Sequence, residues 1–349
     1  MIRRGIRPHS PSRRAVLAGG GGLAAFALAG CGGESAPTDE AGRVRIRLAL
    51  DGRAGCEHGG FYQALASGAY ARRGLNVQMV QGDPALQPAQ GLATGAVELA
   101  LATDSFQALA LVAEDAPVRA VAAYFQRDPQ VLIAHPAPDL ESPEDLAGRP
   151  IHLPARARPG LWTWLRAKYG YTEDQLRDPA ALPQAYLDDP EAVHLGLATR
   201  DVAAITLADG PAPRVFDLSE EGYGAYGCLV LAPNGFARDN AQALRAFLAA
   251  SSEGWRDYIQ GDRSGGVQAA DALIRKANPA MSQAVLSQAR AALRTGGYVD
   301  GGDAALYGLG AMTADRWRTF VDTVSQAGVV APDLDWRQAF TNQYLPGRG

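Results

Sequence analysis

The amino-acid sequence predicts an α/β protein built from two strand-and-helix units and a helical C-terminal segment. Short β-branched and apolar runs alternate with helical patterns from residue 44 to about residue 135, and the alternation returns between residues 151 and 233. After Pro233 the chain carries helical periodicity almost throughout. Such alternation is typical of a mostly parallel sheet that is covered by helices on both faces.

The first unit is expected to open with a strand, because Val44, Ile46, Leu48 and Leu50 fall on one face of an extended chain. Each later strand is expected to be separated from the next by a helix or a turn. The expected strands are 44–50, 75–80, 97–102, 118–125 and 130–135, and the expected helices are 60–71, 88–94 and 105–114.

The second unit repeats this order after a capped helix. Ser142 is a good N-cap residue, Pro143 suits the first helical position, and two acids follow in the first turn. The segment 172–175 has the pattern of a capping box. The expected strands are 151–154, 202–207, 215–218 and 227–233, with a helix over 161–170.

The C-terminal segment is expected to be helical. An amphipathic helix over 240–260 would bury an apolar stripe, and shorter helices are expected over 267–277 and 284–294. Another helix should start at Thr313. The residues expected on the buried faces of the first and last of these helices are Leu244, Phe247, Leu248, Trp255, Ile259, Trp317, Phe320, Val321 and Val324.

The N-terminus has the features of an export signal. Arg13 and Arg14 precede an uncharged run over 15–30, which is shorter than the ~20 residues that span a bilayer as a helix. The run ends in Leu-Ala-Gly before Cys31, which resembles a bacterial lipoprotein signal, and the paired arginines also resemble a twin-arginine signal. Residues 1–30 would then be a signal peptide, with Cys31 acylated and the protein held at the outer face of the cytoplasmic membrane. The alternative is an uncleaved apolar helix.

Residues 31–43 are rich in Gly, Ser, Pro and acids, which predicts a flexible tether. Removal of the first 30 residues, which hold five arginines and no acid, would change the formal charge from −4 to −9. An acidic surface argues against nucleic acid as a partner.

The cysteines left after Cys31 are Cys56 and Cys228, which could form a disulfide or be two buried thiols. No cofactor or metal site is expected, because the sequence has no glycine-rich phosphate loop and its histidines lack zinc-like spacing.

Several segments together resemble a known family. They are EHGGFYQALASGAYARRGLNVQMVQG at 57–82, LATGAVELALATDSFQALAL at 92–111, the strands of 118–135 followed by SPEDLAGRPI, and GAMTADRWRTFVDTVSQAGVV at 310–330. The family is that of the substrate-binding proteins for alkanesulfonates, taurine, nitrate and the thiamine pyrimidine precursor. The resemblance implies a type 2 periplasmic binding protein, in which two α/β lobes are joined by a hinge around a central ligand cleft. Lobe 1 would comprise 44–135 and 228–349, including the helical C-terminal segment, and lobe 2 would comprise 136–227.

The resemblance also implies a function. The protein would be the monomeric solute-binding component of an ABC importer, and it would deliver a small molecule to permease and ATPase subunits. The ligand would be a nitrogenous heterocycle such as a thiamine precursor. Binders of that pyrimidine carry a tryptophan where this chain has Gly52 and Arg53, and an acid where it has Arg200, so a small organic anion is the alternative. Further alternatives are a ligand-sensing subunit and an enzyme similar to the pyrimidine synthases. The enzyme is disfavoured because the cysteine cluster and pocket lysine of those synthases are absent from the sequence.

Ligand contacts are expected where helices begin after strands, because helix N-termini offer unpaired N–H groups there. These positions are 52–60, 103–105, 154–160 and 199–201, with the hinge strand near 227. Structural alternatives exist for each candidate, such as helix capping for His58 or core packing for Trp162. The candidate ligand-binding residues are His58, Tyr62, Asp104, Arg156, Arg158, Trp162, Arg200 and Tyr226.

Overall fold

The structure, a computed structural model, describes residues 37–82, 88–261 and 266–347. The expected signal peptide, Cys31 and the first part of the tether lie outside these ranges. Residues 37–43, which we expected to be tether, form a turn in which Thr38 bridges to Val44 and Asn76 donates a hydrogen bond to Asp39. Within the described ranges, no helix combines the length and the apolar character that crossing a membrane requires.

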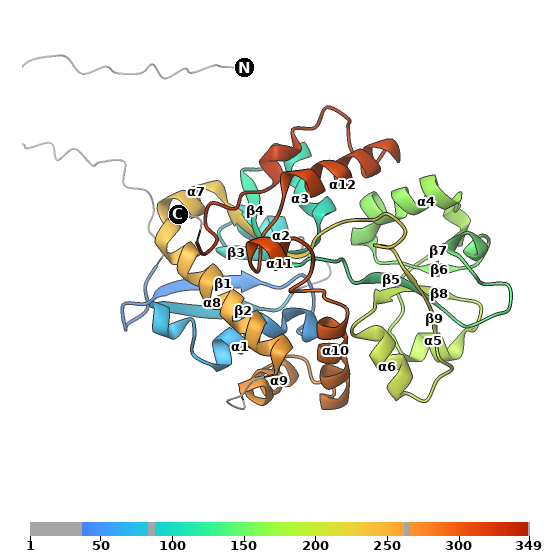
Figure 1. The fold of residues 1–349 in the computed structure, drawn as a ribbon, viewed down its shortest axis with the longest axis horizontal. Helices are drawn as coiled ribbons and strands as arrows, with labels where there is room; N and C mark the ends of the chain where they lie inside the picture. The colour runs from blue at the N-terminus through green and yellow to red at the C-terminus, as the bar shows by residue number, and fades with distance from the viewer. Residues whose placement is uncertain (1–36, 83–87, 262–265, 348–349) are drawn as a thin grey trace, which may run out of the picture. The chain divides into compact units, whose positions relative to one another are not determined.

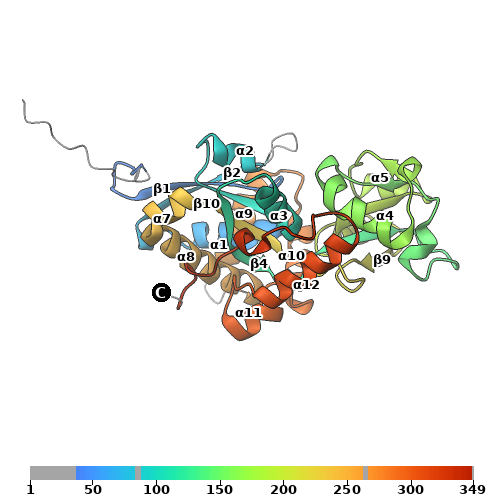
Figure 2. The same cartoon turned by 90° about the horizontal axis from the view of Figure 1, so that it is seen from above.

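The first sheet has five strands in the order β2 (Leu75–Val80), β1 (Val44–Ala49), β3 (Leu99–Asp104), β10 (Gly227–Pro233) and β4 (Val118–Phe125). Strand β1 pairs in parallel with β2 and β3, whereas β10 runs antiparallel to both of its neighbours. Strands β3 and β4 are therefore joined only through a strand that comes more than a hundred residues later. Figure 1 shows β1, β2, β3 and β4 in the blue to green colours of the early part of the chain, and Figure 2 labels β10.

The second sheet has the order β7 (Leu176–Arg177), β6 (Ile151–His152), β8 (Val193–Leu197), β5 (Gln130–Ala134) and β9 (Arg214–Asp217). Strand β5 runs antiparallel to β8 and β9. We expected β5 in the first lobe, but its hydrogen bonds place it in the second sheet. The chain therefore crosses between the sheets at residues 126–129, immediately after β4, and returns between β9 and β10. Below, lobe 1 and lobe 2 denote the first and second sheets with their helices.

Helices cover both faces of the first sheet (Figure 2). Strand β10 illustrates the alternation, since Val230 belongs to one hydrophobic core while Leu229 and Leu231 belong to the other. The residues expected to be buried on the helices all lie in these cores. One face carries α1 (Gly59–Ala66), α8 (Ala241–Gln260), α9 (Gly266–Ala277) and α10 (Gln283–Thr295), and the other carries α3 (Ser105–Ala113) and α12 (Ala314–Gln326). The short helices α2 (Pro88–Ala93), α7 (Asn234–Asp239) and α11 (Gly302–Tyr307) complete this part of the chain.

Glycines allow α1 and α8 to pack closely. A Cβ atom added at Gly254 would lie 2.2 Å from the carbonyl oxygen of Gly60, and one added at Gly60 would lie 2.1 Å from the Trp255 ring. Any larger side chain at either position would force the two helices apart. This contact holds the start of α1, and with it the preceding loop, against the core.

Lobe 2 carries α4 (Thr163–Tyr169), α5 (Gln184–Asp188) and α6 (Asp201–Leu207). We expected residues 202–207 to form a strand, and this prediction was wrong because they form α6. The strand of this region is β8, which the sequence did not reveal. Gly196 weakens its strand pattern, and an added Cβ there would lie 2.6 Å from Ile133 on the neighbouring strand, so glycine is required by close packing rather than by a turn.

Candidate ligand-binding site

A cavity of about 80 Å³ lies where residues of the two lobes meet. Asp51 follows the carboxyl end of β1, Thr103 lies near the end of β3, and Leu197 ends β8. Ligands in open α/β sheets bind at such carboxyl ends. The cavity is lined by Asp51, Gly52, Arg53, Glu57, Thr103, Phe125, Pro129, Arg156, Leu197, Arg200 and Cys228.

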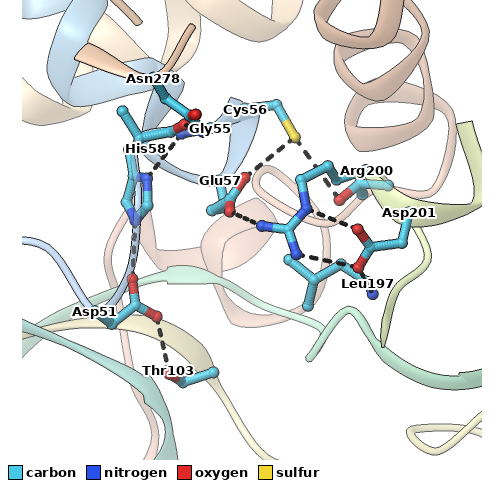
Figure 3. Close-up of polar contacts among 12 residues, drawn as sticks. Asp51, Gly55, Cys56, Glu57, His58, Thr103, Leu197, Arg200, Asp201 and Asn278 are labelled. Carbon is cyan, nitrogen blue, oxygen red and sulfur yellow. Dashed lines mark hydrogen bonds and ion pairs between the residues drawn. The ribbon is translucent and has the colours of Figure 1, made fainter. Parts of the chain in front are cut away.

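The Asp51 carboxylate is held by two side chains (Figure 3). His58 Nε2 lies 2.8 Å from Oδ1, and the Thr103 hydroxyl donates to Oδ2 at 2.8 Å. The backbone N–H of Gly55 donates to His58 Nδ1 at 3.2 Å, which leaves Nε2 to donate to Asp51. Burial opposes ionisation, but the hydrogen bonds from His58 and Thr103 and the charge of Arg156 lower the pKa of Asp51 to about 2. An ionised carboxylate therefore faces the cavity at neutral pH.

Arg200 reaches from lobe 2 to lobe 1. Its Nη1 donates to Glu57 Oε1 at 2.5 Å, while Nε and Nη2 donate to the two oxygens of Asp201 at 2.8 and 3.1 Å. Figure 3 shows the guanidinium group between the two carboxylates. Burial works against its charge, but Glu57 and Asp201 raise the pKa of Arg200 well above its usual value. Arg200 is therefore a charge already paired within the protein.

The two remaining cysteines are free and buried beside this network. Cys56 contacts both Glu57 and Thr199, and Cys228 donates to the carbonyl oxygen of Glu57 at 3.5 Å. Burial and the charge of Glu57 raise the pKa of the Cys56 thiol, so it is a weak nucleophile at neutral pH. Among the described residues, no group of three or more His, Cys, Asp or Glu side chains is placed to hold a metal ion.

Three of the eight predicted residues belong to this site. Arg156 and Arg200 line the cavity, and His58 lies directly behind Asp51. His58 is almost fully buried; burial lowers its pKa, but Asp51 outweighs that effect and raises it. Its role is therefore to orient and stabilise Asp51 and not to line the cavity itself.

Tyr62, Trp162 and Arg158 are not among the residues that line the cavity. Tyr62 packs in the core together with its neighbour Phe61, and the Tyr62 hydroxyl accepts a hydrogen bond from Gln81. Trp162 is buried, with its indole N–H donating to Glu173. Arg158 pairs with Asp178 at 2.7 Å on the surface of lobe 2.

Asp104 and Tyr226 belong to the hinge instead. Asp104 caps α3 by accepting from the backbone N–H of Gln107. Its Oδ2 accepts from Gln130, which follows the first crossing, and from Tyr223, which lies in the return crossing. Burial raises the pKa of Asp104. The Tyr226 hydroxyl donates to Asp303, and its ring packs under the Arg316 guanidinium at 4.1 Å.

Sequence reasoning missed Asp51, Thr103 and Glu57 as individual residues. Glu57 and Thr103 lie inside segments that we singled out, but Asp51 lies one residue before the first of them. The signal that could have found Asp51 is an acid placed directly after an apolar strand, at the edge where a parallel sheet binds ligands.

Comparison with known proteins agrees with this architecture. The family described as NMT1/THI5 like matches residues 56–262, which is more than half of the chain. The riboflavin-binding protein RibY of Chloroflexus aurantiacus is 26% identical over 330 residues, which cover 89% of each chain. The formylaminopyrimidine-binding protein of Halalkalibacterium halodurans is 28% identical over 245 residues, covering 68% of this chain and 73% of the relative.

Solved structures share the fold. The periplasmic aliphatic sulphonate binding protein SsuA from Escherichia coli superposes with a TM-score of 0.60 at 14% identity, covering 85% of this chain and 92% of SsuA. Two sheets joined by two crossings, with a cavity lined from both, place the chain in the fold class of the periplasmic binding proteins. Within that class, the chain belongs to the NMT1/THI5-like family.

Proposed function

We propose that this protein is the solute-binding component of an ABC importer and that it binds a nitrogenous heterocycle. The family, the fold and the position of the cavity support a binding protein, and the two named relatives bind riboflavin and formylaminopyrimidine according to their names. The protein would capture its ligand outside the cytoplasm and deliver it to a permease and its ATPase. Cys31 would hold the protein at the outer face of the membrane.

The observation that carries the choice of ligand is the ionised Asp51 carboxylate at the cavity wall. Ring N–H and amino groups of a heterocycle are hydrogen-bond donors, and a carboxylate accepts from them strongly. His58 and Thr103 each use one acceptor position on Asp51, and a carboxylate offers about four. Asp51 can therefore take further hydrogen bonds from a ligand while its orientation stays fixed.

The pairing of Arg200 weakens the case for a simple organic anion. We expected Arg200 to offer a positive charge to the ligand, but Glu57 and Asp201 already neutralise it. An anion placed at Arg200 would have to compete with both carboxylates, at a cost of desolvation and repulsion. Asp51 lines the same cavity and would repel an anionic group placed beside it, so the part of the ligand that meets Asp51 should be a hydrogen-bond donor.

Calorimetric titration with riboflavin, formylaminopyrimidine and an alkanesulfonate tests this proposal. We expect a heterocycle to bind, and Asp51→Asn to weaken its binding about 10- to 100-fold, because a charge-assisted hydrogen bond contributes about 1.5–3 kcal/mol. Asp178→Asn removes a carboxylate that pairs with Arg158 outside the cavity, and this matched control should bind like the wild type. Binding of the sulfonate alone, or unchanged affinity in Asp51→Asn, would contradict the proposal.

A further inference from the structure

Arg53 and Arg156 reach the same cavity from different lobes. Arg53 lies in the loop after β1, and Arg156 lies in a short 3₁₀ helix (Ala155–Ala157) after β6. Both residues are exposed, and both line the cavity. Each lobe therefore contributes one arginine to the cavity wall.

These two arginines differ from the other charged groups of the cavity because their side chains have no partner among the described residues. Asp51 is held by His58, and Glu57 is paired with Arg200. Within the described part of the chain, neither Arg53 nor Arg156 forms a hydrogen bond or an ion pair. Arg156 acts on Asp51 only through its charge.

A neighbouring arginine, Arg158, does form an ion pair. It lies two residues after Arg156 and forms an ion pair with Asp178 at 2.7 Å. Arg158 is not among the residues that line the cavity, whereas Arg156 is. The unpaired arginine of the segment is therefore the one placed to meet a ligand.

We infer that the ligand is a heterocycle carrying a phosphate monoester, with the phosphate held between Arg53 and Arg156 and the ring at Asp51. This inference rests on the proposed function and adds the charged group of its ligand. A guanidinium donates two parallel hydrogen bonds to an oxyanion. A phosphate monoester has three terminal oxygens and nearly two charges at neutral pH, so it matches two arginines, whereas one arginine suffices for a carboxylate.

The opposite charges of Asp51 and of the two arginines would orient the ligand. Asp51 would repel the phosphate and accept from ring N–H groups, while the two arginines would attract the phosphate. A phosphate that contacts both arginines also connects the two lobes. The phosphorylated ligand should therefore bind more tightly than its parent.

Titrations of riboflavin, riboflavin 5′-phosphate and inorganic phosphate at low ionic strength test the inference. In the wild type, we expect the phosphate ester to bind at least tenfold more tightly than riboflavin and than inorganic phosphate. The double variant Arg53→Gln/Arg156→Gln should lose this advantage and keep the affinity for riboflavin. Arg158→Gln makes the same chemical change on the same segment outside the cavity, and it should keep the advantage.

Three results would overturn the inference. Equal affinities for the ester and riboflavin in the wild type would show that the phosphate is not recognised. Equal weakening of both flavins in the double variant would give the arginines a role unrelated to phosphate, and inorganic phosphate binding as tightly as the ester would mean that the ring is not recognised.

If neither flavin binds, the proposed function is wrong for flavins. The titration with inorganic phosphate then still tests whether Arg53 and Arg156 bind a phosphate group. Phosphate binding that the double variant loses and Arg158→Gln retains would support the anion subsite. No phosphate binding to the wild type would overturn it.

Discussion

At the scale of single residues, His194 is a buried polar group without a hydrogen-bond partner among the described residues. Neither ring nitrogen is hydrogen-bonded, and the ring stacks on His152 with 4.8 Å between centroids. Burial, together with the charge of His152, lowers the pKa of His194 to about 4. The folded protein therefore holds His194 neutral at pH values where the unfolded chain would protonate it.

This difference predicts a loss of stability in acid. The folded pKa lies below the unfolded value of 6.5, so the stabilisation is complete above pH 6.5 and is lost as the pH falls towards 4. The phenylalanine of His194→Phe cannot titrate, so this variant should remove on the order of 3 kcal/mol of the dependence of unfolding free energy on pH in this window. Urea unfolding at several pH values measures the effect.

His194→Gln is the control, because it keeps polarity without a titrating ring. Both variants should show a flatter dependence of unfolding free energy on pH than the wild type. A wild-type slope in both variants would mean that other groups cause the acid sensitivity.

The site residues show which contacts sequence can predict. The segments that could contact a ligand were located from the sequence, because a parallel sheet binds ligands at the carboxyl ends of its strands and the order of strands and helices shows where those ends fall. Which side chain faces the cavity depends on the rotation of each helix and on long-range partners. Tyr62 turns into the core and Arg200 is neutralised by Glu57, which lies 143 residues away in the sequence.

At the scale of elements, the contact of Arg200 at the start of α6 with Glu57 before α1 joins the lobes. The lobes can separate only if this ion pair breaks, because its partners belong to different lobes. Arg200 keeps Asp201 as a partner within its own lobe, so the cost of separation is the loss of one partly buried charge pair. Without ligand, this pair favours the closed arrangement.

Arg200→Gln should therefore open the protein. We expect a larger radius of gyration by small-angle scattering without ligand, and ligand binding weakened by about 1–3 kcal/mol, because the closed form loses an ion pair. Arg47→Gln is the matched control, since Arg47 pairs with Glu98 inside the first lobe. Identical scattering from wild type and both variants would show that the ion pair does not hold the lobes together.

Most elements could be predicted because their patterns are strong. Strands β1, β2 and β4 start at the expected residues, and α8 follows its apolar stripe. The failure at α6 has a physical cause: Val202, Ile205 and Thr206 favour strands by propensity, but their helix fits after β8 and places Ile205 in a core. Local preference was overridden by tertiary packing.

At the scale of the whole molecule, we proposed that Cys31, which lies outside the described residues, is acylated and anchors the protein. Cys31→Ala should leave the protein uncleaved or released, because the acylated residue would be lost. Stable anchoring needs more than one acyl chain, so the mature protein should carry several. Membrane fractionation with mass spectrometry of the N-terminus measures this, and a variant that still fractionates as a lipidated mature protein would contradict the assignment.

The position of β10 between β3 and β4 has a consequence for synthesis. Until residues 227–233 leave the ribosome, β3 and β4 each present an unpaired edge, and the two halves of the first sheet have no hydrogen bonds between them. Most of lobe 2 is a continuous insertion that emerges earlier and needs no later strand. The nascent chain therefore carries a finished lobe beside an unfinished one, and during that interval the open sheet edges must be protected from aggregation by chaperones or by rapid completion of the chain.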